Sequence, residues 1–114
     1  PPYWGSCTVR VYWTGLHGVL GEAQFVNWSL AVERLSIGLD ITADSFDTAV
    51  NVLAAVPGDS GDLQYTDFTL TKTQADELLP GEAFRLLLER DLLEVTDTYE
   101  GIAQVLGMAM WINK

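Results

Sequence analysis

The sequence predicts a mainly β protein, an antiparallel sandwich of two sheets with one short helical turn near residues 73–79. Apolar and polar side chains alternate with a period of two in several segments, as in half-buried strands. Clusters of Gly, Pro, Asp and Ser separate these segments. Aromatic residues make up 11% of the chain, which favours strands over a helical bundle. About seven strands indicate a sandwich, and a partly open barrel is the next choice.

The chain of 114 residues has the size of a single domain. We expect residues 1–5 to form an extended N-terminal arm, because the two leading prolines lack amide donors and fit a sheet ladder poorly. Residues 6–114 would form the sandwich domain. The aromatic pair Tyr3 and Trp4 in the arm must bury against this domain or against a neighbouring subunit.

The first strand is expected at residues 6–14. One face carries Cys7, Val9, Val11 and Trp13, and the residues between them are mostly polar. This alternation predicts that the apolar face points into the core. Residues 15–18 then turn the chain and contain its only histidine, His17, which we interpret as an ordinary loop residue.

The next two segments are less clear. Residues 23–42 are apolar and β-rich, and the phase of the apolar positions changes at Glu33 and Arg34. We interpret them as two strands of a hairpin, with a helix through residues 30–39 as the alternative. Residues 44–57 fit a helix capped by Ser45 but also alternate as a strand does. Their short length and the neighbouring strands favour a strand, followed by a loop at residues 57–62.

Residues 66–90 combine a strand, a capped turn, a Pro-Gly corner and a second strand. Phe68 and Leu70 mark the inner face of the first strand. Thr73 is placed to cap the N-terminus of a helical turn, and Asp76 completes a pattern like a capping box.

The capped turn should direct apolar side chains inward and then stop. Its inward side chains are expected to be Ala75, Leu78 and Leu79. Proline cannot continue a helix and glycine accepts unusual dihedral angles, so Pro80 and Gly81 end the turn. A new strand is predicted from residue 83.

After a connector at residues 91–97, residues 98–112 form a long last strand that is apolar on both faces. One face is expected to carry Ile102, Leu106, Met108, Met110 and Ile112, interrupted by Gln104. The other is expected to carry Ala103, Val105, Gly107, Ala109 and Trp111. Such a strand is buried on both sides or has an interface over one side. Gly101 and Gly107 would permit bends or bulges.

Charge and cysteine content exclude several classes of function. Six basic residues face sixteen acidic ones, for a formal net charge of -10, and the basic residues are scattered. This pattern argues against binding to nucleic acid or to an anionic membrane, and it favours solubility or a basic partner. The single cysteine, Cys7, excludes an intrachain disulfide. Because we find neither a secretory signal nor an apolar span, we expect a soluble protein made in a reducing compartment.

We find no constellation that would support catalysis, a cofactor or a metal. His17 lies in a glycine turn without a nucleophile elbow, and phosphate-binding glycine patterns are absent. Two groups of acidic residues lie in loops, one formed by Asp40, Asp44 and Asp47 and the other by Asp59 and Asp62. Neither has the spacing of a known calcium loop. We therefore expect a protein that is not an enzyme and has no catalytic, cofactor-binding or metal-binding residues.

Large aromatic side chains offer a second class of function. Exposed aromatic rings can stack on sugars, and the candidates are Trp4, Tyr12, Tyr65, Tyr99 and Trp111. Burial in the core or at a subunit interface is the more common role of such residues. A sandwich that binds carbohydrate or another ligand is therefore the alternative function.

One part of the chain resembles a known family. The segments FTLTKTQADELLPGEAFRLLLERD (68–91) and EGIAQVLGMAMWI (100–112) resemble the C-terminal half of small β-sandwich modules in tailed-phage virions. The immunoglobulin-like N-terminal domain of baseplate upper proteins is an example. The resemblance implies an immunoglobulin-like sandwich without catalytic residues. It also implies a structural role in the virion as a capsid decoration, connector, baseplate or fibre module.

On this interpretation the protein is made in the host cytoplasm and assembles into the virion. Its partners would be further copies of itself or other virion proteins, without nucleic acid or membrane. We expect the partner contacts at Tyr3 and Trp4 in the arm and at Trp111 in the last strand. Aromatic residues are enriched at such interfaces.

Overall fold

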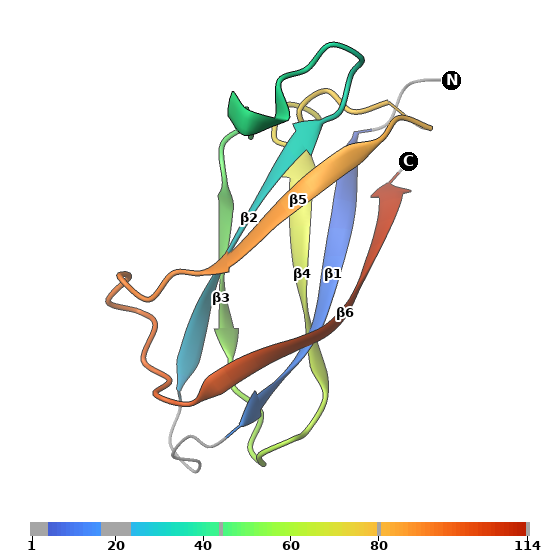
Figure 1. The fold of residues 1–114 in the computed structure, drawn as a ribbon. Coiled ribbons are helices and arrows are strands. Elements are labelled where there is room, and N and C mark those ends of the chain that lie inside the picture. The colour runs from blue at the N-terminus through green and yellow to red at the C-terminus, as the bar shows by residue number, and fades with distance from the viewer. Residues whose placement is uncertain (1–4, 17–23, 44, 80, 114) are drawn as a thin grey trace.

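A computed structural model describes residues 5–16, 24–43, 45–79 and 81–113, and its six strands form two antiparallel sheets (Figure 1). The strands are β1 Ser6–Leu16, β2 Phe25–Arg34, β3 Val50–Ala55, β4 Gln64–Thr71, β5 Phe84–Arg90 and β6 Ile102–Asn113. One sheet has the order β4-β1-β6 and the other β3-β2-β5. The predicted two-sheet sandwich is confirmed, with six strands in the described residues instead of about seven.

The alternation in β1 places its apolar face in the core, as predicted. Cys7, Val9, Val11 and Trp13 are all fully buried. The facing sheet contributes alternate residues of β2 to the core, and β4 contributes two more side chains. These core residues are Val26, Trp28, Leu30 and Val32 from β2 and Phe68 and Leu70 from β4. The two central strands, β1 and β2, therefore supply most of the buried apolar side chains that pack between the sheets.

Two tryptophans meet edge to face at the centre of the core. The ring centroids of Trp13 and Trp28 lie 5.4 Å apart with an interplanar angle of 75°. The indole Nε1–H of Trp13 donates to the Thr66 hydroxyl at 2.9 Å. Edge-to-face packing suits the quadrupoles of two aromatic rings, so this contact joins the two sheets.

The predicted hairpin in residues 23–42 is wrong, and so is the alternative helix. Only β2 forms, and it ends at Arg34, where the phase of the apolar positions changes. The chain then makes a turn closed by the Leu39 N–H to the Ser36 carbonyl, and a short 3-10 helix at Ile41–Ala43. Both edges of β2 are taken by β3 and β5, so no edge remains for a hairpin partner. Ile37, an apolar residue of the predicted second strand, is fully exposed.

The preference for a strand within residues 44–57 is confirmed at Val50–Ala55, which pairs with β2. Ser45 does not cap a helix, because no helix follows it in the described residues; its backbone N–H donates to the Glu33 carboxylate. Residue 44 lies outside the described residues. The loop predicted at residues 57–62 is present between β3 and β4.

The capping box lies two residues earlier than predicted. The Thr71 hydroxyl accepts from the Gln74 N–H at 3.2 Å, and the Gln74 side chain accepts from the Thr71 N–H at 2.9 Å. This reciprocal pair starts one hydrogen-bonded turn over residues 72–77. The turn ends because Asp76 and Glu77 both adopt positive φ, which a helix does not continue.

The apolar side chains of this turn follow the prediction in part. Ala75 and Leu78 are buried, but Leu79 is 37% exposed. Gly81 has a φ of 86°, so the expected role of glycine at the corner is confirmed. Pro80 lies outside the described residues. The strand expected after residue 83 is present as β5.

Candidate interaction surface

The last strand, β6, forms an edge of its sheet and leaves a long apolar surface uncovered. Its twelve residues include no charged side chain. Its exposed apolar side chains are Ile102, Val105, Leu106, Met108, Trp111 and Ile112, each between 37% and 56% exposed. A long, uncharged edge strand is a template for pairing with another strand.

A β-bulge divides β6 and changes which side chains share a face. Tyr12 pairs with Gly107 while Trp13 pairs with Val105, so Leu106 is the extra residue. The bulge expected near Gly107 is confirmed. The predicted faces hold for residues 107–112 but are wrong for residues 102–105, because the extra residue reverses the parity. Val105 belongs to the inner face, opposite Trp13, and Gln104 belongs to the outer face, opposite Thr14.

An apolar cavity of about 330 Å³ opens beside the C-terminal end of β6. One wall comes from Leu78, Leu79 and Glu82 before β5 and from Phe84 at its start, and β6 supplies the other with Met110 and Ile112. The buried Cys7 lies at the cavity, and burial raises the pKa of its thiol. The cavity therefore has mainly apolar walls and a protonated thiol, and its lining residue Glu82 is paired with Arg34.

The cavity lies on the side of the sandwich between β5 and β6, which we call the open side. On the opposite side β3 and β4 contact each other across the two sheets, whereas β5 and β6 have no comparable contact. Figure 1 shows β5 and β6 crossing the same side of the molecule, and among the described residues no strand pairs with the edge of β6 that faces away from β1. Of the two edge strands on the open side, β5 carries the charged residues Arg85, Glu89 and Arg90, whereas β6 carries none.

A cluster of aromatic and charged side chains covers the outer face of the β4-β1-β6 sheet. The Arg10 guanidinium lies 3.7 Å from the Tyr65 ring centroid and 5.0 Å from that of Trp111. It also forms a two-point ion pair with Asp67, at 2.8 and 3.0 Å. The hydrogen bond from Arg10 lowers the pKa of Asp67, and the same bond raises the pKa of Arg10. The cluster is therefore preorganised and half-exposed, with the guanidinium over both rings.

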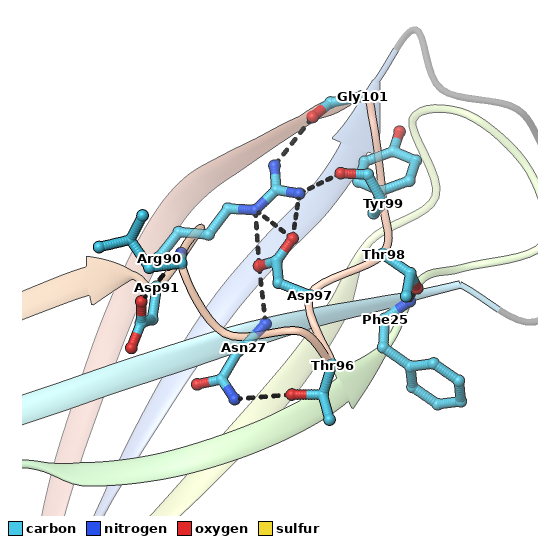
Figure 2. Close-up of polar contacts among 10 residues, drawn as sticks. Phe25, Asn27, Arg90, Asp91, Thr96, Asp97, Thr98, Tyr99 and Gly101 are labelled. Carbon is cyan, nitrogen blue, oxygen red and sulfur yellow. Dashed lines mark hydrogen bonds and ion pairs between the residues drawn. The ribbon is translucent and has the colours of Figure 1, made fainter.

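A buried ion pair helps to fasten the segment that follows β5 to the rest of the protein, together with hydrogen bonds to Phe25 and Asn27 (Figure 2). Arg90 Nη2 lies 2.6 Å from Asp97 Oδ1, and the two side chains are 16% and 2% exposed. The same guanidinium donates to the carbonyls of Tyr99 and Gly101. Asp97 also accepts from the Asn27 N–H at 2.9 Å. These bonds tie β5, β2 and the start of β6 together at one point.

The charge state of Asp97 follows from these partners. Burial alone would raise the pKa of the Asp97 carboxyl. The hydrogen bonds from Arg90 and Asn27, together with the charge of Arg90, outweigh burial and lower it. Asp97 is therefore ionised at neutral pH and serves as an anchor. Between the two anchored ends the chain presents Leu92, Leu93 and Val95 to solvent, at 69%, 95% and 89% exposure.

A second buried ion pair covers the outer face of the other sheet. Glu33 is 1% exposed at its side chain and contacts Arg85 Nε at 2.6 Å. The hydrogen bond from Arg85, with a further one from the Ser45 N–H, outweighs burial and lowers the pKa of Glu33. The Arg85 guanidinium also lies 4.7 Å from the Phe46 ring centroid. These contacts, with a hydrogen bond from Arg85 to the Ile41 carbonyl, hold Ile41, Ser45 and Phe46 close to the sheet and cover the part of this face around Glu33.

The predicted contact residues can now be placed. Trp111 lies on the outer face of β6 and is 39% exposed, whereas Tyr3 and Trp4 lie outside the described residues, as does His17. Of the other aromatic candidates, Tyr65 is exposed and Tyr99 is buried, its hydroxyl donating to the Leu16 carbonyl. The aromatic positions alone did not indicate Arg10, because its contacts with Asp67 and Tyr65 join residues more than fifty positions apart.

The described residues contain no group of three or more His, Cys, Asp or Glu side chains placed to hold a metal ion. Asp40 instead accepts from the N–H and hydroxyl of Thr42, at 3.0 and 2.6 Å, which lowers its pKa and closes a local turn. No helix in the described part of the chain is long and apolar enough to cross a membrane.

Comparison of the chain with models of protein families, with curated proteins and with solved structures gives no match.

Proposed function

We propose that this chain is a non-enzymatic structural module of a phage particle, in a capsid decoration, connector, baseplate or fibre. It acts by presenting apolar surface to further copies of itself or to other virion proteins. The observation that carries the protein-binding role is the uncharged edge strand β6 with the cavity beside it. The phage setting comes from the resemblance of segments 68–91 and 100–112 to sandwich modules of tailed-phage virions.

The geometry of the open side fits a partner protein well. A partner that covers β6 removes apolar side chains from water, which stabilises a complex by about 25 cal/mol per Å². It also pairs the unsatisfied backbone groups of the edge. A specific interface needs on the order of 800 Å² per partner, and the β6 edge, the cavity and Trp111 offer adjoining surface of this kind.

The virion role is tested by the location of the gene and of the protein. We expect the gene to lie among capsid or tail genes. We also expect mass spectrometry of purified particles to recover the chain in a fixed ratio to the major structural proteins. A gene remote from structural genes, together with absence of the chain from purified particles, would contradict the proposal.

The Arg10 cluster supports a second candidate function, the binding of a carbohydrate or another polar ligand. Tyr65 and Trp111 flank a guanidinium and a carboxylate on an exposed face, which together offer stacking surface and charged hydrogen-bonding groups. A glycan array tests this candidate, with Tyr65→Ala as the matched variant. Binding that Tyr65→Ala abolishes would favour it, whereas no binding across the array would rule out carbohydrate.

A further inference from the structure

We propose that β6 pairs with β6 of a second copy, antiparallel and around a two-fold axis at Met110. The two β4-β1-β6 sheets then form one continuous six-stranded sheet. This inference rests on the proposed role of β6 as a protein interface and adds the identity of the partner and the register.

The sequence of β6 after its bulge is complementary to itself. Residues 107–113 form a regular stretch, opposite residues 6–12 of β1. With Met110 on the axis, Met108 lies opposite Ile112 of the second copy, so the inner-face pairs are apolar. On the outer face Ala109 lies opposite Trp111, a small residue beside a large one. Because side chains alternate, this register keeps both inner faces on the same side of the joined sheet.

The cavity beside β6 gives the inner-face side chains of the second copy a place to pack. Ile112 lines this cavity together with Phe84 and Leu79. In the proposed register Met108 of the second copy lies across from Ile112 and so extends towards the same cavity. Methionine fills irregular apolar spaces well because it is unbranched and flexible. Met108 is 41% exposed in the single chain, and the pairing would bury it.

Charge favours β6 as the place where two copies meet. Each copy has a formal net charge of -10, so two copies repel each other over most of their surface. The β6 strand has no charge of its own, and no like charges face each other directly in the paired strands. The remaining repulsion between the copies is screened by salt, so association should strengthen as ionic strength rises.

Sedimentation velocity over a range of concentrations tests the pairing. We expect the chain to form a dimer more tightly at high salt than at low salt. Met108→Lys should weaken the dimer about tenfold or more, because it places a charge opposite Ile112 in both halves of the interface. Leu93→Lys is the matched control, since Leu93 is 95% exposed and lies in the connection between β5 and β6, outside the paired strand, and it should leave the dimer unchanged. Equal weakening by the two variants would overturn the proposal.

Disulfide trapping tests the register without changing the inner face. Ala109→Cys and Trp111→Cys lie on the outer face, and the native Cys7 is buried. A mixture of the two variants should form the cross-linked pair faster than either variant alone, because only residues directly opposite each other fit disulfide geometry. No preference for the mixed pair would overturn this register.

The outcomes separate this inference from the proposed function. A chain that is monomeric at all concentrations but present in purified particles would overturn the β6 pairing and leave the virion role intact. A chain that forms the β6 dimer but is absent from particles would support the pairing and contradict the virion role.

Discussion

Trp13 and Trp28 are equally buried but differ in one hydrogen bond, which gives a matched pair of core substitutions. Trp13 donates to Thr66, whereas the Trp28 Nε1–H has no hydrogen-bond partner among the described residues. Both substitutions to Phe leave similar space, but Trp13→Phe also strands the buried Thr66 hydroxyl. We expect Trp13→Phe to lower the free energy of unfolding by about 1–2 kcal/mol more than Trp28→Phe does. Urea denaturation measures the difference, and equal losses would contradict the assigned role of the bond.

Two glycines near the start and middle of β6 also differ in their surroundings. A Cβ on Gly101 would lie 2.3 Å from the Tyr99 ring and 2.6 Å from the Leu16 carbonyl, the acceptor of the Tyr99 hydroxyl. A Cβ on Gly107 would meet nothing within 4 Å. We therefore expect Gly101→Ala to lower the melting temperature by an amount corresponding to about 1–3 kcal/mol, from overpacking. Gly107→Ala should change it little, and a loss of similar size there would contradict this explanation.

At the scale of single residues, the sequence predicts burial better than it predicts partners. The alternation in residues 6–14 placed four side chains in the core correctly, because a period of two depends only on neighbouring residues. It put Arg10 on the outer face but could not identify Asp67 or Tyr65 as its partners. Those contacts depend on the register of β1 against β4, which only the fold defines.

At the scale of elements, the ion pair between Arg90 and Asp97 fixes the connection from β5 to β6. Asp97→Asn removes the charge and places an amide donor near the guanidinium of Arg90. We expect a loss of about 2–3 kcal/mol of stability at pH 7, because one partner of a buried pair is left without its counter-charge. Glu100→Gln is the control, since it makes the same change in charge on an exposed residue, and it should cost little.

The pH dependence of this stabilisation has a definite sign. The pKa of Asp97 is lowered in the folded protein, so its contribution is complete above the unfolded value of about 3.9. The contribution is lost as the pH falls below about 4 and through the folded pKa. The stability gap between the native chain and Asp97→Asn should therefore narrow on acidification. A gap that stays constant from pH 7 to pH 3 would contradict the assignment.

There is a physical reason why the sequence predicts some elements correctly and others not. Strands with strict alternation were located to within a few residues, because one face of each is buried. The failed hairpin at residues 35–42 shows the limit: its apolar residues favour a strand, but β3 and β5 already occupy both edges of β2. Similarly, the bulge at Leu106 reversed the predicted faces of residues 102–105. The alternation of apolar residues does not show at which position an extra residue is inserted.

At the scale of the whole molecule, the sandwich has one closed side and one open side. β3 and β4 contact each other on the closed side, and the open side exposes the uncharged β6 with the cavity beside it. The sequence predicted that an apolar surface on the last strand would form an interface. The cavity could not be predicted, because only the folded chain brings together its walls, which include Leu79 and Phe84 on one side and residues 110–112 on the other. The open side is the central element of the proposed function.

Amide hydrogen exchange of β6 tests the central claim, that this edge is a protein interface, most directly. In dilute solution the amides of residues 107–113 that point away from β1 should exchange quickly, because no strand pairs with them. At high concentration, or in an assembled particle, they should become protected, while amides at the outer edge of β4 should keep their dilute-solution rates. Exchange in β6 that is equally fast in the dilute and the assembled protein would contradict the claim.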